Sequence, residues 1–279
     1  MPSSAPFAAV DQGDVAFLEV DGIAYRCYVW QRNTETSEAG GEIQRYRGLR
    51  IEAAIYTEGP HGQSVLLHRG IVRSPAEGEN VDCPRVVALG NVFHVHWIEY
   101  DPAEVSGVEI VTASGRDLHR ATFDITTSPY EWNHRGSIAT SYLHLYDVHS
   151  MDSSEDYILA HAGTDDSIDV LRVNGETWLD YAWTVSEGSL TLDEQVLGVV
   201  ADRLAPAVFY QSSGALRAFS RRYSTGASAH ADFEITGSPG GEIVAISGTR
   251  TGDGDDSNLF VVYEYLSTVS SIDLPAVCT

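Results

Sequence analysis

The sequence contains no lysine. All 17 basic residues are arginine, against 40 aspartate and glutamate residues and a formal net charge of −23. Such an acidic surface repels nucleic-acid backbones and anionic membranes, so we expect neither as a partner. Selection for solubility in a GC-rich genome and adaptation to high salt would both produce this composition, and composition alone leaves the two explanations open.

The chain also lacks an apolar run as long as a membrane span, and residues 1–10 lack the basic region that begins a signal peptide. We therefore expect neither membrane insertion nor a cleaved leader. Cysteine is scarce. There are three, an odd number, at Cys27, Cys83 and Cys278, and their spacing matches no zinc-binding pattern. They are predicted to be small buried hydrophobic residues. Phosphate-binding loops and a Ser-His-Asp signature are absent as well.

What the sequence does have is a repeat. Ile71-Val-Arg-Ser-Pro75 recurs as Ile125-Thr-Thr-Ser-Pro129 and as Ile235-Thr-Gly-Ser-Pro239, and a degenerate copy ends at Ser186. The repeats are spaced by about 50 to 60 residues, a period typical of units that bury their apolar faces only by stacking on neighbours. Val, Ile, Tyr, Phe and Trp dominate the apolar runs, which favours strands.

Each repeat can be divided into four short strands separated by Gly, Asp, Ser or Pro turns, and the last repeat has only three. The predicted strands are 15–20, 23–31, 49–56 and 65–72; 86–89, 92–98, 108–112 and 121–126; 138–147, 157–162, 168–173 and 180–185; 197–201, 207–211, 216–223 and 231–236; 243–247, 259–266 and 270–274.

The missing last strand has a candidate at the other end of the chain. Phe7-Ala-Ala-Val10 precedes the first repeat, where the previous repeat's fourth strand would lie. We therefore predict an all-β, five-bladed β-propeller of four-stranded antiparallel blades, closed by the N-terminal strand, with residues 1–279 as a single domain. A two-sheet sandwich would not explain the repeat, and a β-solenoid usually has shorter coils.

Two segments resemble a known group of propellers. Asp14-Val-Ala-Phe-Leu-Glu-Val-Asp-Gly-Ile-Ala-Tyr25 and Pro84-Arg-Val-Val-Ala-Leu-Gly-Asn-Val-Phe-His94 resemble the first two blades of five-bladed propeller glycoside hydrolases of the arabinanase and xylosidase group. The resemblance implies that Asp14 is the general base. The chain departs from that group at Val15, where proline is expected, and at Arg85, where an acidic residue is usual. Asn174-Gly-Glu-Thr-Trp178 resembles part of a turn in sialidase-type propellers.

One segment, predicted as a loop between blades, is dense in side chains that could bind a ligand. It comprises Tyr130, Glu131, Trp132, Asn133, His134 and Arg135. Its aromatic rings could stack on a sugar, and its amide, imidazole and guanidinium groups could donate to hydroxyls or carboxylates. The alternative is that the aromatic residues cap the core while the charges are solvated.

Paired carboxylates would be needed for glycoside hydrolysis. Candidates are Asp14, Glu131 and Asp101, together with the acids of a polar loop predicted at residues 32–42. With 40 acidic residues, however, carboxylates near any site are expected by chance. A guanidinium at Arg85 would pair with Asp14 and lower its pKa, which suits a structural role better than base catalysis. The sequence therefore favours a chain without hydrolytic activity.

Metal sites are weaker candidates. His94-Val-His96 places two imidazoles on one face of a strand, where a third ligand would make a metal site; partly buried histidines in a tight stack are the alternative. Asp253, Asp255 and Asp256 cluster oxygens suited to calcium, although an exposed acidic turn needs no ion. We expect no required cofactor.

These patterns favour a non-enzymatic propeller that binds or assembles with other protein subunits or a glycan, for instance a structural component of a virion. A propeller-type glycoside hydrolase and a carbohydrate-binding lectin are the alternatives.

Overall fold

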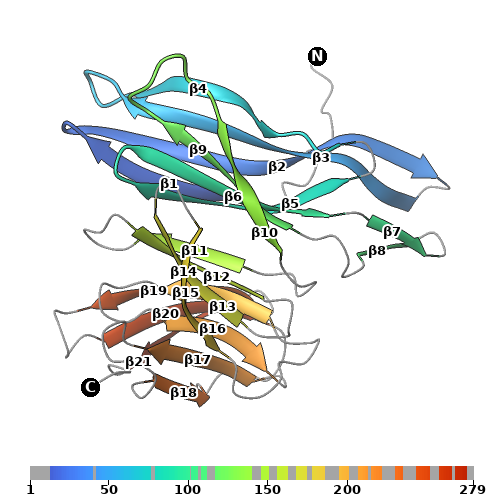
Figure 1. Cartoon of the computed structure of the whole chain (residues 1–279), viewed down its shortest axis with the longest axis vertical. Coiled ribbons are helices and arrows are strands. Elements are labelled where there is room, and N and C mark those ends of the chain that lie inside the picture. Colours follow the sequence, from blue (N-terminus) through green and yellow to red (C-terminus); the bar gives the residue numbers. More distant parts are fainter. Residues whose placement is uncertain are drawn as a thin grey trace. The chain divides into compact units, whose positions relative to one another are not determined.

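The computed structural model describes residues 13–39, 42–76, 79–100, 102–105, 108–111, 117–139, 146–150, 156–162, 168–174, 178–185, 195–200, 207–212, 215–221, 230–234, 243–251, 258–265 and 268–274. These residues form antiparallel sheets, and most sheets have four strands (Figure 1). The chain divides into two units, residues 1–142 and 143–279. No helix with the length and hydropathy of a membrane span occurs among the described residues.

The first unit contains two four-stranded sheets. The first sheet has the order β1-β2-β3-β4, with the strands β1 (Gly13–Val20), β2 (Ile23–Ala39), β3 (Glu42–Glu58) and β4 (Ser64–Arg73). The second has the order β10-β9-β6-β5, with β5 (Asn80–Leu89), β6 (Val92–Tyr100), β9 (Asp117–Asp124) and β10 (Asn133–Ala139). Between β6 and β9 the chain forms a separate hairpin of β7 (Pro102–Val105) and β8 (Val108–Val111).

Alternating side chains explain why these segments form strands with an inner face. Ala16 and Leu18 of β1 are buried, whereas Val15 and Phe17, which alternate with them, are exposed. The turn from β1 to β2 is made by Asp21 and Gly22, both with positive φ, as a two-residue hairpin turn requires. Gly90 and Asn91 form another two-residue turn, between β5 and β6, in which Gly90 alone has positive φ.

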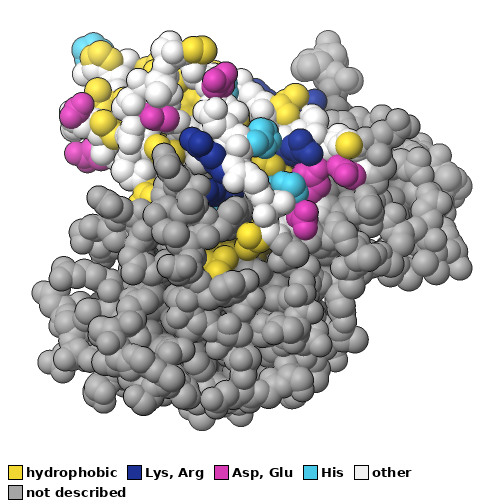
Figure 2. Space-filling view, viewed as in Figure 1, with side chains coloured by type: hydrophobic (Ala, Val, Ile, Leu, Met, Phe, Trp, Pro, Cys, Tyr) yellow, Lys and Arg dark blue, Asp and Glu magenta, His cyan; other side chains and the backbone are white. Residues whose placement is uncertain are grey.

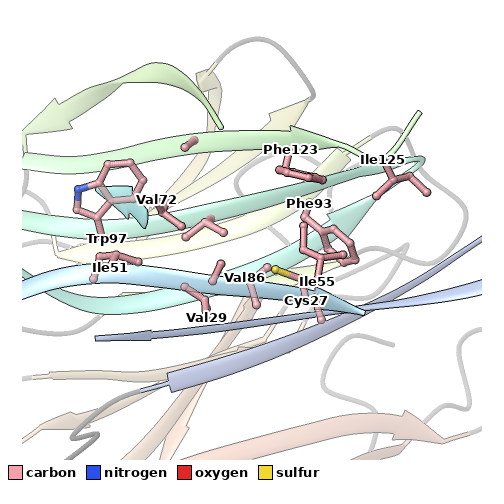
Figure 3. Packing of buried hydrophobic residues seen from close by; sticks show 14 of the residues in the cluster. Cys27, Val29, Ile51, Ile55, Val72, Val86, Phe93, Trp97, Phe123 and Ile125 are labelled. Atoms are coloured by element: carbon pink, nitrogen blue, oxygen red, sulfur yellow. The ribbon is translucent and has the colours of Figure 1, made fainter. Parts of the chain in front are cut away.

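The core of the first unit consists of buried side chains from both sheets (Figure 3). Its largest fully buried members include Phe93, Trp97 and Phe123 of the second sheet and Ile51 and Ile55 of the first. Cys27 belongs to this core, and Cys83 is also buried, as predicted for both. Each sheet buries its apolar face against the other, as expected for repeat units that bury apolar faces only by stacking on neighbours.

The second unit contains three sheets, each formed by strands consecutive in sequence. They are β11-β12-β13-β14, β15-β16-β17-β18 and the three-stranded β19-β20-β21. Their strands are β11 (Tyr146–Ser150), β12 (Asp156–Ala162), β13 (Ile168–Asn174), β14 (Trp178–Val185), β15 (Gln195–Val200), β16 (Ala207–Ser212), β17 (Ala215–Arg221), β18 (His230–Glu234), β19 (Ile243–Thr251), β20 (Asn258–Tyr265) and β21 (Thr268–Leu274). Among the described residues of the C-terminal part, the last sheet has the three strands that the sequence predicted there. Residues 7–10 lie outside the described residues, so the closing strand remains a prediction.

The second repeat differs from its predicted division. The segment predicted as its third strand, 108–112, lies in the β7–β8 hairpin, and the segment predicted as its fourth lies largely in β9, the third strand of the sheet. The fourth strand is β10, which contains Ile138 and Ala139. The predicted first strand of the third repeat, 138–147, was therefore wrong, because that repeat begins with β11.

The polar segment 32–42 was predicted as a loop, but most of it forms strand. β2 and β3 continue as a two-stranded ribbon beyond β1 and β4, with Glu35 paired to Arg47 and Ser37 to Arg45 in the register. The ribbon has no apolar alternation, which is why the sequence pattern did not predict it.

Candidate functional site

An open groove lies on the outer face of the first sheet, the face opposite the core. Its volume is about 860 Å³. Three aromatic side chains line it, Tyr28 and Trp30 of β2 and Tyr56 of β3. Its polar lining comprises Asp14, Arg26, Ser64 and Arg69. Alternation along the strands places these aromatic side chains on the outer face, because Cys27, Val29 and Ile55 between them point into the core.

The aromatic residues form the floor of the groove. The rings of Tyr28 and Tyr56 meet edge to face, with centroids 5.9 Å apart and planes at 84°. Tyr28 remains 41% exposed. Rings presented in this way to solvent, within a hollow, offer flat apolar surface for a ligand to stack on.

Two arginines border this floor. The guanidinium of Arg69 lies 5.8 Å from the centroid of the Trp30 ring, a cation–π arrangement that holds the side chain over the groove. Arg26 is the register partner of Tyr56. A smaller hollow is lined by Arg26, Tyr56 and Ser64 of the groove and by Glu58.

Asp14 lies at one edge of the groove and joins the two sheets of the unit. Its carboxylate accepts a hydrogen bond of 2.9 Å from the backbone N–H of Val86 in β5 and one of 2.8 Å from its own neighbour Val15. Burial raises the pKa of this carboxyl, and the backbone hydrogen bonds and the charge of Arg85 offset this only in part. The charge of Arg85 lowers the pKa of Asp14, as predicted, but burial outweighs it and the net shift is upward.

The segment predicted as a ligand loop is only partly a loop. Asn133, His134 and Arg135 lie in β10, the edge strand, and Arg135 donates a 3.1 Å hydrogen bond to the hydroxyl of Thr122. The ring of Tyr130 stacks on buried Phe123 at 5.6 Å, and Trp132 packs on the same ring at 5.0 Å.

These contacts place both aromatic residues of the segment against the core, although Tyr130 stays 38% exposed. Glu131 is exposed, and the ring of His134 meets Trp97 edge to face. The two hollows described above lie on the first sheet and do not include this segment. The ligand-binding role of residues 130–135 therefore stays a prediction.

The two imidazoles of the His94-Val-His96 motif are buried in the second sheet. Burial, reinforced by the charges of Arg120 and Arg135, lowers the pKa of His94 to about 3, and burial also holds the pKa of His96 far below its usual value. Both rings are therefore neutral at pH 7. The described residues contain no group of three or more side chains suited to a metal.

A second polar cluster surrounds Trp97 at the junction of β4, β6 and β9. Glu99 accepts two hydrogen bonds from the guanidinium of Arg73, at 2.6 and 3.1 Å, and a third from the Trp97 indole at 3.3 Å. Burial opposes the ionisation of Glu99, but these hydrogen bonds keep its pKa below the usual value. The ring of His119 stacks on Trp97 with centroids 5.7 Å apart. Figure 2 shows arginine, histidine and acidic side chains close together on the visible face of the described residues.

The remaining candidates cannot be located. Asp101 and the calcium candidates Asp253, Asp255 and Asp256 lie outside the described residues. The groove itself was not predicted, because the sequence argument placed ligands at loops and not on a sheet face. A signal was nonetheless present: β2 carries tyrosine and tryptophan on its outer side as well as apolar residues on its inner side.

Comparison with solved structures supports a propeller architecture. The chain is similar to the fucose-recognising, six-bladed propeller lectin of Aleuria aurantia, with 9% identity over 94% of this chain and 91% of the lectin and a TM-score of 0.52. It is also similar to an arginine mutant of AofleA from Arthrobotrys oligospora, with 13% identity over 94% of this chain and 67% of that one and a TM-score of 0.56.

A sialidase of Trypanosoma rangeli, solved with sialic acid, is similar at 11% identity and a TM-score of 0.50, over 89% of this chain and 43% of the sialidase. No protein-family model matches the sequence, and no curated protein sequence does either. At these identities the similarity shows the fold alone. The chain is an all-β protein of antiparallel four-stranded sheets that resembles the β-propellers.

Proposed function

We propose that this chain is a carbohydrate-binding module that holds a glycan in the groove of the first sheet. The observation that carries the proposal is the aromatic floor of Tyr28, Trp30 and Tyr56 beside two guanidinium groups in one open hollow. Sugar rings have apolar C–H faces that stack on aromatic rings, and hydroxyls that accept hydrogen bonds from arginine. The fucose-recognising lectin of Aleuria aurantia supports the proposal as an example of a binding function on a similar fold.

The groove favours binding over hydrolysis. Glycoside hydrolysis generally requires two carboxyl groups roughly 5 to 10 Å apart across the bond. Among the described residues that line the groove, Asp14 is the one carboxylate, and both of its oxygens accept backbone hydrogen bonds. A structural role in a virion, which was the first expectation from the sequence, stays a prediction.

Paired tyrosine variants test the proposal. Tyr28 and Tyr130 have nearly equal exposure, but one lies in the groove and the other in the segment predicted from sequence. Tyr28→Ala should weaken glycan binding by roughly tenfold or more, because a buried aromatic contact at a binding site typically contributes more than 1 kcal/mol. Tyr130→Ala should bind like the parent. Binding would be found on a glycan array and quantified by calorimetry.

Three outcomes would count against the groove. Loss of binding in Tyr130→Ala alone would transfer the site to the segment predicted from sequence. An array with no bound glycan would overturn the proposed function. If Tyr28→Ala instead lowered the melting temperature by many degrees without any glycan, the outer face would be a packing surface for protein.

We also propose that residues 7–10 pair with the last sheet as its missing fourth strand. The support is the three-stranded β19-β20-β21 sheet beside four sheets of four strands. Deleting residues 1–12 should lower the melting temperature by several degrees, because it would leave a sheet edge unpaired. Deleting only residues 1–5 is the matched control. Equal melting of both truncated chains and the parent would contradict pairing by this segment.

A further inference from the structure

The arginines of the groove differ from others on the same sheet in having no acidic partner. Arg32 and Arg50 both pair with Glu52, and Arg73 pairs with Glu99. Within the part of the chain that the structure describes, Arg26 and Arg69 form no ion pair, and the one contact recorded for Arg69 is with the Trp30 ring. In a chain with 40 acidic residues and 17 arginines, two guanidinium groups in one hollow that form no ion pair are unusual.

Two acids near the groove are already engaged, whereas Glu58 lines the smaller hollow together with Arg26. Glu52 lies on the same outer face but is buried and bonded to Arg32 and Arg50. The carboxylate of Asp14 accepts backbone hydrogen bonds, and its burial disfavours the charged form. The lining of the groove itself therefore contains two arginines and one carboxylate, that of Asp14, on a strongly anionic protein.

The register of the sheet positions the two guanidinium groups on either side of the tyrosine pair. Arg26 lies on β2 opposite Tyr56, and Arg69 lies on β4 opposite Ala54, which is itself opposite Tyr28. Two strand spacings and two residues along the strand separate their Cα atoms by roughly 12 Å. Either long side chain can thus reach a substituent on a ring that stacks on Tyr28 or Tyr56.

We propose, on the basis of the function proposed above, that the groove selects sugars that carry a carboxylate, of the uronic acid class. A planar guanidinium matches a carboxylate with two parallel hydrogen bonds, and such charge-assisted bonds are about twice as strong as neutral ones. A neutral hexose offers a hydroxymethyl group at the same position, whose single uncharged oxygen cannot form this pair of parallel hydrogen bonds. The overall negative charge of the protein makes the local arginines necessary for any anionic ligand, because the long-range field repels it.

The test compares sugars that differ only at C6. The methyl glycosides of glucuronic, galacturonic and mannuronic acid are each measured by calorimetry against the neutral glucoside, galactoside and mannoside, at pH 7.5 and low salt. At least one acidic sugar should bind about tenfold more tightly than its neutral counterpart. Arg26→Met or Arg69→Met should reduce this ratio to near one. Arg32→Met is the matched control on the same strand and should keep the ratio, since Arg50 still pairs with Glu52.

Each of the other outcomes contradicts a different part of the proposals. Equal affinity for acidic and neutral sugars would overturn the selection for carboxylates and leave the carbohydrate-binding function intact. No binding of any of the six glycosides, together with an empty glycan array, would overturn both. If both Arg26→Met and Arg69→Met kept the preference for acidic sugars, other residues would bind the carboxylate. Melting curves of the variants, with Arg26→Gln and Arg69→Gln as milder alternatives, would separate lost binding from lost folding.

Discussion

Lowering the pH from 7.5 to 5.0 is expected to destabilise this protein, and the buried histidines are the reason. His94 and His96 have folded-state pKa values far below the unfolded value of about 6.5, with that of His94 at about 3. Between these values the unfolded chain binds more protons than the folded one, so the free energy of unfolding falls as the pH falls. At pH 5.0, each histidine that remains neutral in the fold costs roughly 2 kcal/mol at 1.36 kcal/mol per pH unit.

Urea denaturation at the two pH values measures this effect. Glu99, whose pKa is lowered in the folded state, would lose its contribution to stability only below pH 5.0. A lower limit of pH 5.0 therefore measures the effect of the histidines without that of Glu99. His94→Gln is the matched variant, because glutamine retains hydrogen-bonding groups but cannot be protonated. Its stability should change less between the two pH values than that of the parent. If the parent were equally stable at both, relief of repulsion among the 40 acidic residues would outweigh the histidines.

The substitution Phe123→Ala should cost about 3 to 5 kcal/mol in the free energy of unfolding. Phe123 is fully buried and contacts three further rings, those of His68, Tyr130 and Trp132. Removing it deletes apolar area and leaves a cavity that these rings can fill only partly. A loss of this size is a large share of the 5 to 15 kcal/mol by which domains are typically stable.

Phe17→Ala provides the same change at a surface position, since Phe17 is 63% exposed on the outer face of the first sheet. Its effect should stay within about 0.5 kcal/mol. Denaturant midpoints of the two variants, measured side by side, test the comparison. If the two costs were similar and large, Phe17 would be covered by protein in solution; if both were small, the core assigned to the first unit would be wrong.

Local patterns predicted the hairpins of the first unit but not the composition of every sheet. The residues Asp21-Gly22 and Gly90-Asn91 identify tight turns, because glycine adopts the positive φ that such turns need. Residues 121–126 and 231–236 were both predicted as fourth strands, yet the first segment lies largely in the third strand of its sheet and the second in a fourth strand. The same residue pattern suits either a third or a fourth strand, because strands at both positions pack against a sheet. Which position a strand takes depends on its pairing with segments distant in the sequence.

The same limit applies to the groove. Tyr28, Trp30 and Tyr56 can be assigned to strands from sequence, but their common hollow depends on the register of β2 and β3 and on which face the core occupies. The acidic partners of Arg32 and Arg50 likewise become visible only when Glu52 is placed between them. Because acidic residues are so frequent, spacing in the sequence cannot show which arginines form ion pairs with them and which do not.

The core shared between the two sheets has a consequence for synthesis on the ribosome. The first sheet is complete in the nascent chain at Arg73, but its apolar face is covered by Phe93, Trp97 and Phe123, which are translated later. At about 5 to 20 residues per second, the roughly 50 residues from Arg73 to Ile125 take about 3 to 10 seconds to appear. For that interval Ile51, Ile55 and Val72 have no partner sheet, and the emerging chain depends on chaperones or on its acidic side chains to stay unaggregated.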